Sequence, residues 1–225
     1  MKNKLLILFL LFFSCLSMNS YLLADDLIFE TSTIEITNKG NTIFATNGSA
    51  KSSDGNIQII ADKFQYNKDL SLLKATGNVE VLDLLNKTSF KSENILYEIN
   101  NKIILSNSES IIKDRLNSFF YLGAFSYNLS NNIVKMDKVK VIDFDNNKVE
   151  IDKAFLNLSS NSLIGKDLSI NFNDKGFDNE NEPRLKANSI SSDESGSIMS
   201  KGVFTTCKKN DNCPPWQISA KEIRH

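Results

Sequence analysis

The stretch at residues 57–83, IQIIADKFQYNKDLSLLKATGNVEVLD, has the pattern of two β-strands joined by a turn. Phe64 and Tyr66 are two residues apart, so they share one face of an extended chain. Residues 67–69, Asn-Lys-Asp, form a polar break with the composition of a turn. Residues 76–78, Thr-Gly-Asn, break the next apolar run, and residues 79–81 then restore a strict alternation. The stretch therefore predicts a strand, a turn and a strand.

Versions of this unit recur along the whole chain. Similar runs lie at residues 34–40, 92–105, 124–136 and 154–165, with a weaker copy at 187–199. Five positions recur in successive copies at a nearly constant interval: Ile36, Tyr66, Tyr97, Tyr127 and Leu156. Such a fixed period is typical of a stacked repeat architecture.

The pattern favours an all-β fold with little helix. No window of about 12 residues carries the apolar stripe of an amphipathic helix, and each unit supplies two short strands of about 6–8 residues. Residues 171–186 interrupt the pattern and predict a long polar loop. Ile218, Ala220 and Ile223 indicate one more strand near the end of the sequence. We expect stacked antiparallel strands with one apolar face, which either packs as a core or lines a hollow.

Composition limits the classes of function. The 225 residues allow one or two domains, and an apolar content of 41% is sufficient for a core. The formal net charge of −1 gives no electrostatic case for binding nucleic acid.

The N-terminus has the pattern of a secretion signal. Lys2 and Lys4 precede an apolar run at residues 5–16, and residues 22–24, Leu-Leu-Ala, end with a small residue suited to signal peptidase. We expect residues 1–24 to be this signal, and its removal leaves 24 basic and 27 acidic residues, a net charge of −3. A membrane anchor is an alternative, but the run is shorter than the roughly 20 residues that span a bilayer. A lipoprotein would use Cys15, which Phe12 and Phe13 place in a poor lipobox.

Catalytic and metal chemistry find little support in the sequence. His225 is the only histidine, so no Ser-His-Asp or Cys-His pair is expected inside the fold, and we predict that the protein is not an enzyme. Cys207 and Cys213 lack a second pair of zinc ligands. The acidic residues at 174–182 lack the spacing of an EF-hand and indicate a solvated loop rather than a calcium site. We expect no metal and no cofactor.

Two motifs resemble a known family. The pattern ADKFQYN…ATGNVEV at residues 61–81 resembles the OstA-like strand modules of periplasmic lipopolysaccharide transport. The segment FTTC…CPPWQISAKEIRH at residues 204–225 resembles the end of the N-terminal periplasmic domain of the LptD family, which assembles lipopolysaccharide in the outer membrane. In that family a transmembrane β-barrel follows this point, and the present sequence does not include it.

The resemblance implies a fold and a function. The fold would be an open β-jelly-roll, a V-shaped trough, over residues 25–206, with residues 207–225 as a junction toward the barrel. The function would be periplasmic binding and transfer of lipopolysaccharide at the outer membrane, because acyl chains exposed to water cost about 0.8 kcal/mol per CH₂. The implied partners are lipopolysaccharide acyl chains, other OstA-like modules joined edge to edge and, in a full-length protein, the barrel and its plug lipoprotein. Family disulfides join the periplasmic domain to the barrel, which the resemblance suggests for Cys207 and Cys213; a bond between these two cysteines is the alternative.

The candidate residues of the lipid groove are the apolar anchors of successive repeats. They are Phe64, Tyr66, Ile95, Tyr97, Phe125, Tyr127 and Leu156. Phe155 belongs to the same aromatic series. Packing of the repeats against one another is the simpler interpretation, and lining of an acyl-chain groove is the functional one. Two further interpretations of the chain remain open: a stand-alone LptA-like periplasmic bridge, and a purely structural β-solenoid of the adhesin type.

Overall fold

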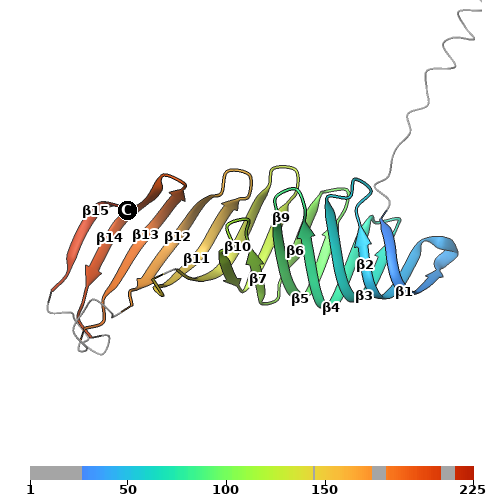
Figure 1. Cartoon of the computed structure of the whole chain (residues 1–225), viewed down its shortest axis with the longest axis horizontal. Coiled ribbons are helices and arrows are strands. Elements are labelled where there is room, and N and C mark those ends of the chain that lie inside the picture. The colour runs from blue at the N-terminus through green and yellow to red at the C-terminus, as the bar shows by residue number, and fades with distance from the viewer. Residues whose placement is uncertain (1–26, 144, 174–180, 209–215) are drawn as a thin grey trace, which may run out of the picture.

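A computed structural model describes residues 27–143, 145–173, 181–208 and 216–225. Within them the chain forms one antiparallel sheet of fifteen strands, which run from β1 on the right of Figure 1 to β15 on the left. The strands are β1 (Ile28–Thr37), β2 (Thr42–Lys51), β3 (Ile57–Asn67), β4 (Leu72–Asp83), β5 (Thr88–Glu98), β6 (Ile103–Ser106), β7 (Ser110–Lys113), β8 (Phe119–Leu122), β9 (Ala124–Asn128), β10 (Ile133–Ile142), β11 (Lys148–Asn157), β12 (Ser162–Asn171), β13 (Arg184–Asp193), β14 (Gly196–Thr205) and β15 (Ile218–Arg224). A short 3₁₀ turn, η1 (Asn38–Gly40), joins β1 to β2. The predicted all-β antiparallel class is confirmed.

Four short strands, β6 to β9, occupy two strand positions in the middle of the sheet. One half of β5 pairs with β6 and the other half with β7. In the same way β10 pairs with β9 along one half and with β8 along the other. The segments β6–β7 and β8–β9 are therefore two long strands, each interrupted in the middle, and the remaining strands pass through this region without a break.

The long strands change phase in the middle. Buried side chains alternate along β10 at Val134 and Met136, but the next buried position is Val139, three residues further on. Lys138 lies at this point with a φ of 54°. Equivalent left-handed residues occur at the same level of β2, β4, β12 and β14: Asn47, Asn78, Asp167 and Lys201. A bulge of this kind bends a strand, and here it keeps the apolar side chains of both halves on one interior face.

These bulges explain a difference from the sequence-based expectation. Residues 76–78 were expected to separate short strands, but β4 continues through them, with a register shift between Thr76 and Val79. β4 is therefore one strand of 12 residues rather than two short ones, and most other strands are similarly long. Each strand contributes two arms, and the arms of all strands together enclose the trough. We call the turns at residues 38–41, 68–71, 99–102, 129–132, 158–161 and 194–195 the first rim, and those at 52–56, 84–87, 114–118 and 143–147 the second rim.

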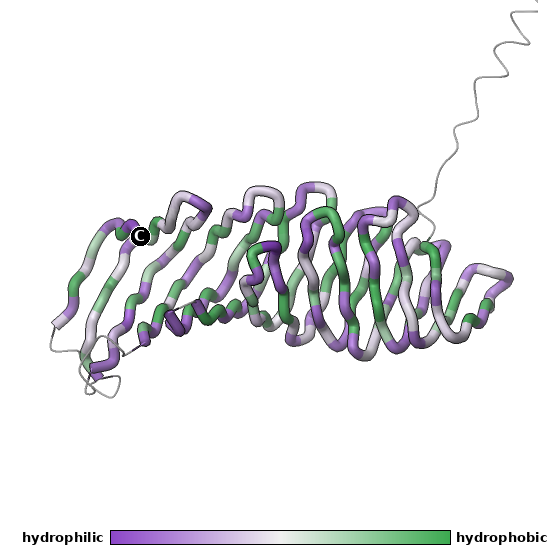
Figure 2. Tube along the Cα trace, in the orientation of Figure 1, coloured by the Kyte–Doolittle hydropathy of each residue, from purple (hydrophilic) through white to green (hydrophobic). Residues whose placement is uncertain are grey.

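The repeat anchors lie in a single row across the sheet. Pairing joins Ile36, Ile43, Tyr66, Leu73, Tyr97, Ile104, Tyr127, Val134, Leu156 and Leu163 in this order. The anchors are two strands apart because each repeat makes one strand up and one strand down. The alternation of hydrophobic and hydrophilic residues that produces this row is visible along the strands in Figure 2.

The interior is filled by side chains from both arms between β1 and β10. Phe90, on the second-rim arm of β5, stacks on Tyr127 of the other arm with ring centroids 5.1 Å apart, and it lies 5.2 Å from Phe125. Phe29 of β1 meets Phe64 and Tyr66 in the same manner, at 6.0 and 6.1 Å. Aromatic contacts between the arms thus close this part of the trough into a packed core.

Candidate functional site

The interior face changes character at the C-terminal end of the sheet. From β11 onward, several apolar side chains of this face remain partly exposed although they pack against the core, whereas on β1–β10 fewer do so, among them Phe29, Ile43 and Val141. We call those of β11–β15 the open interior face: Val149, Leu163, Ile170, Ile190, Phe204 and Ile223. In Figure 1 the strands β11–β15 continue the sheet beyond the part in which the short strands β6 to β9 lie. Partly exposed apolar side chains along one face of five neighbouring strands are the feature of this chain best suited to contact an apolar ligand.

Some interior positions carry small side chains at this end of the sheet. The row that contains Tyr127 continues through Leu156 and Leu163 and ends in Ser192 and Ser197. The adjacent row falls from Phe125 through Met136 and Ala154 to Gly165. Beyond Gly165 the second row becomes large again, at Ile190, Met199 and Ile223, so the reduction in size concerns the row that ends in the two serines and the single position of Gly165.

Gly165 has a specific role in this row. A Cβ atom at Gly165 would lie 2.7 Å from Cγ2 of Ile151 and 3.0 Å from Cγ2 of Ile190. Both distances are too short for carbon atoms in contact. The glycine therefore lets two isoleucines lie over the backbone, and their side chains cover this position of the interior face.

A polar network closes the trough at the end of the packed part. Asp83 and Asn86 belong to the second rim, and Tyr127 and Asn132 to the first rim. The Tyr127 hydroxyl donates a hydrogen bond to Oδ2 of Asp83. The side-chain amide of Asn86 lies 2.7 Å from the same carboxylate oxygen, 3.1 Å from the Tyr127 hydroxyl and 3.0 Å from Oδ1 of Asn132. We call these four residues the closing seam.

The closing seam holds Tyr127 in its neutral form. Burial raises the pKa of the Tyr127 phenol well above its ordinary value, and the hydrogen bond to Asp83 and the charge of Asp83 act in the same direction. The hydroxyl is therefore a permanent hydrogen-bond donor at physiological pH. Asn132 extends the network by donating to Oγ of Ser159 at 2.9 Å on the next turn of the first rim.

A cavity of about 310 Å³ lies beside the seam, between the two rims. Its walls include Asp54 and Leu85 from the second rim and Lys102 and Leu129 from the first. Hydrogen bonds from the Ser52 hydroxyl and the Asn56 backbone hold the pKa of Asp54 below its ordinary value, and the charge of Lys102 acts in the same direction. Asp54 and Lys102 thus place opposite charges on the two sides of this cavity.

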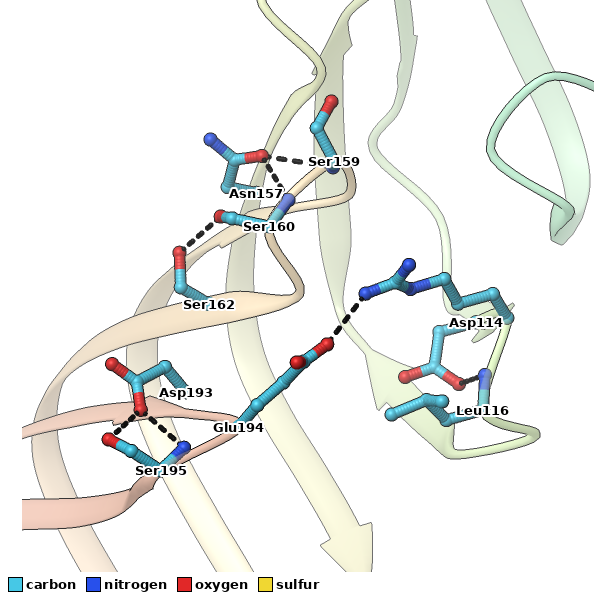
Figure 3. A network of polar contacts seen from close by, with 10 residues as sticks. Asp114, Leu116, Asn157, Ser159, Ser160, Ser162, Asp193, Glu194 and Ser195 are labelled. Carbon is cyan, nitrogen blue, oxygen red and sulfur yellow. Dashed lines mark hydrogen bonds and ion pairs between the residues drawn. The ribbon is translucent and has the colours of Figure 1, made fainter.

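One further contact links the rims near the open end. Arg115 Nη2 lies 3.0 Å from Oε1 of Glu194. Figure 3 shows Glu194 directed toward the turn that carries Asp114 and Leu116. Both partners are exposed to solvent, so this ion pair contributes little to stability. Glu194 lies in the turn between β13 and β14, so this ion pair reaches from the second rim at the β7–β8 turn to the first rim in the C-terminal part of the sheet.

All seven predicted groove residues lie on the interior face. Their exposed fractions are between 0% and 5%: Phe64, Tyr66, Ile95, Tyr97, Phe125, Tyr127 and Leu156. They pack against one another in the closed core, and their contact with lipid stays a prediction. Phe155 does not belong with them, because it is one residue out of phase with Leu156 and lies exposed on the outer face. The residues of the open interior face were not among the predicted groove residues, because they lie outside the regular series of repeat anchors.

The structure describes Cys207 of the two predicted disulfide candidates. Cys207 is buried and its thiol lies 3.8 Å from the carbonyl oxygen of Trp216. Cys213 and Cys15 lie outside the described residues, so both disulfide predictions stay predictions. The Trp216 ring is 6.2 Å from that of Phe204, which in turn contacts Phe172 at 6.0 Å. These three rings form the aromatic end of the open interior face.

The parts of the chain that the structure describes contain no group of three His, Cys, Asp or Glu residues placed to hold a metal ion. They also contain no helix that is long and apolar enough to cross a membrane. The predicted signal at residues 1–24 and most of the acidic loop lie outside the described residues.

No protein-family model matches the chain, and no curated protein matches it. Among solved structures, the chain is similar to LptH from Pseudomonas aeruginosa, described as the LptA homologous periplasmic component of the conserved lipopolysaccharide transport device. The match has 13% sequence identity and a TM-score of 0.24, and it covers 60% of this chain and 77% of LptH.

Proposed function

We propose that this protein is a non-enzymatic carrier of an amphipathic glycolipid of the lipopolysaccharide type, and that it acts in the periplasm at the outer membrane. The observation that carries the proposal is the open interior face on β11–β15. There, apolar side chains that would form a core in a closed trough remain accessible to a ligand. Acyl chains lying along this face would lose contact with water, while the polar head group stayed outside the rims.

The sequence resemblance names the cargo class and the system. The OstA-like pattern at residues 61–81 and the segment at 204–225 resemble the N-terminal region of the LptD family. We propose that β11–β15 form the first contact site for acyl chains. The buried anchors Tyr97 and Tyr127 would meet the cargo only when the closing seam separates.

The edges of the sheet support association with other modules. Within the described residues, β1 and β15 each pair along one side only. Ile34 and Ile36 on β1, and Ile218 on β15, belong to the interior rows but are exposed. An unpaired strand with exposed apolar side chains is a ready site for adding another strand. We propose that another trough continues the sheet at such an edge, as in a stand-alone bridge or an LptD-like module.

Site-specific photo-crosslinking tests the carrier function. A photoreactive residue at Leu163, on the open interior face, is expected to capture the glycolipid in cells. Ile164 is the matched control, because it is the next residue of β12 and is exposed on the outer face. Equal capture at both positions, or capture at neither while the protein is folded and exported, would contradict the proposal and favour a purely structural role.

A further inference from the structure

Exposed apolar side chains gather on the second rim near the middle of the sheet. They are Leu84 (55% exposed), Leu85 (70%), Leu116 (54%), Phe119 (46%) and Ile142 (59%). We call this set the apolar rim patch. None of its members belongs to the open interior face.

Sheet pairing brings these five residues together although they are far apart in the sequence. The start of β5 pairs with the end of β7 through Ser89 and Lys113, so the turns at 84–87 and 114–118 are neighbours. β8 pairs with β10 through Phe120 and Val141, which places Phe119 and Ile142 beside each other at the same rim. Phe119 and Ile142 are out of phase with the buried Phe120 and Val139 and therefore face outward.

The charges around the patch are arranged unequally. The carboxylates of Asp83 and Asp114 are buried and hold their own turns together. Asp114 Oδ1 accepts hydrogen bonds from the backbone N–H groups of Leu116 and Ser118 at 2.9 and 2.8 Å. The basic side chains of the same turns, by contrast, are exposed. They are Lys87, Lys113 and Arg115. Arg115 is paired with the exposed Glu194 of the first rim, and Asp145 in the turn after Ile142 is also exposed, so Lys87 and Lys113 are the basic side chains of the patch that form no ion pair within the described residues.

The basic and apolar side chains also contact each other. Lys113 Nζ lies 5.7 Å from the centroid of the Phe119 ring. Tyr121, two residues beyond Phe119 on the same outer face, is exposed. Along the outer face, leucines therefore lie at the tip of the rim, Phe119 and Lys113 lie next to them, and Tyr121 lies furthest from the tip.

We propose that the apolar rim patch inserts into the interfacial layer of a bilayer that contains anionic lipid. Leucines at the tips of tight turns protrude, and a fluid interface accommodates protruding side chains more easily than a rigid protein surface does. The flanking Lys87 and Lys113 complement anionic head groups, and tyrosine is suited to the polar layer just above the acyl chains. This surface would orient the trough against a membrane independently of its cargo.

Tryptophan fluorescence at defined positions tests the proposal. Leu116→Trp and, as a control on the opposite arm, Ile164→Trp are introduced separately into the full chain carrying Trp216→Phe. Each exported protein is mixed with vesicles of phosphatidylcholine and phosphatidylglycerol at 3:1, or of phosphatidylcholine alone. We expect a blue shift and quenching by brominated acyl chains at position 116 with anionic vesicles, weaker with neutral vesicles or added salt, and no change at position 164.

A loss-of-binding variant provides the second measurement. Leu85→Ser combined with Leu116→Ser is expected to lower co-sedimentation with the anionic vesicles by about tenfold. Ile164→Ser combined with Ile198→Ser, on the outer face of the other arm, is expected to leave it unchanged. Circular dichroism and the urea midpoint establish that each variant is folded.

Absence of a spectral change at position 116, or equal changes at 116 and 164, would overturn the proposal. The proposal would also be overturned, in favour of a protein partner, if Leu85→Ser/Leu116→Ser sedimented with anionic vesicles as well as the unmodified protein does but no longer crosslinked to another protein in cells. The vesicles contain no glycolipid and Leu116 lies outside the open interior face. Failure here therefore leaves the carrier function intact, and failure of cargo capture at Leu163 leaves the membrane contact intact.

Discussion

Tyr127 contributes both to the packed core and to the polar contact between the rims. Its ring stacks on Phe90 in the core, while its hydroxyl reaches Asp83 on the opposite rim. The position of Tyr127 in the repeat was predictable from the regular spacing of the anchors. Its partner was not, because Asp83 is 44 residues away and belongs to a different arm. The sequence contains no pattern that shows which residue of the second rim lies opposite a given residue of the first rim.

Tyr127→Phe is expected to destabilise the protein by about 1.5–3 kcal/mol, because the hydrogen bond that it removes ends on a buried carboxylate. Urea unfolding measures this difference. Tyr121→Phe is the control, since that hydroxyl belongs to an exposed residue on the outer face, and it should leave the midpoint unchanged. Equal midpoints for Tyr127→Phe and the unmodified protein would mean that the closing seam contributes nothing.

The same side chain predicts a dependence on pH. The pKa of Tyr127 is raised above the value of 10.0 expected for an unfolded chain. Its contribution to stability is therefore complete below about pH 10 and is lost as the pH rises above that value, because the unfolded state then ionises first. The stability of the unmodified protein should fall more steeply between about pH 9.5 and 11 than that of Tyr127→Phe. Parallel curves for the two proteins would contradict this assignment.

At the scale of the strand, the bulges determine the shape. Such a bulge can be recognised in the sequence where the spacing of alternating apolar residues changes from two to three at a polar residue. In β10 this change occurs between Met136 and Val139, at Lys138. Without it, the pattern predicts two short strands instead of one bent strand. The all-β class and the interior face of each half follow from local alternation. The joining of the halves depends on the left-handed residue between them.

Lys138→Val tests the importance of the left-handed conformation. Valine is disfavoured at a φ of 54°, so the substitution is expected to cost about 1–3 kcal/mol. Lys135→Val is the matched control, because Lys135 is an exposed residue of the same strand with ordinary extended backbone. It should be neutral or slightly stabilising. The two urea midpoints decide the question, and equal values would mean that β10 passes the bulge without strain.

At the scale of the molecule, one row of side chains changes from packing to exposure along the sheet. Leu73 and Leu163 occupy the same row, but Leu73 is fully buried in the closed part and Leu163 is partly exposed in the open part. The sequence did not distinguish them, because both follow the same alternation. Their difference depends on whether tyrosine or serine lies on the adjacent strand, which becomes clear only when the register is known.

Leu73→Ala and Leu163→Ala compare the two halves directly. The first should cost about 2–5 kcal/mol, because it leaves a cavity in a packed core. The second should cost about 1 kcal/mol, because its site is already partly hydrated. Urea unfolding of both variants provides the comparison, and a cost at Leu163 as large as that at Leu73 would show that the C-terminal half is packed as tightly as the rest.

The path through the sheet also sets the polarity of its two edges. Thirteen strands follow one another from β1 to β15, and every neighbouring pair is antiparallel. Because this number is odd, β1 and β15 run in the same direction. Copies joined from β15 to β1 with their interior faces on one side must therefore form a parallel ladder. An antiparallel joint between β15 of one copy and β1 of the next would turn the interior face of one copy to the opposite side of the sheet. Two β1 edges, or two β15 edges, can join antiparallel about a two-fold axis with both interior faces on one side.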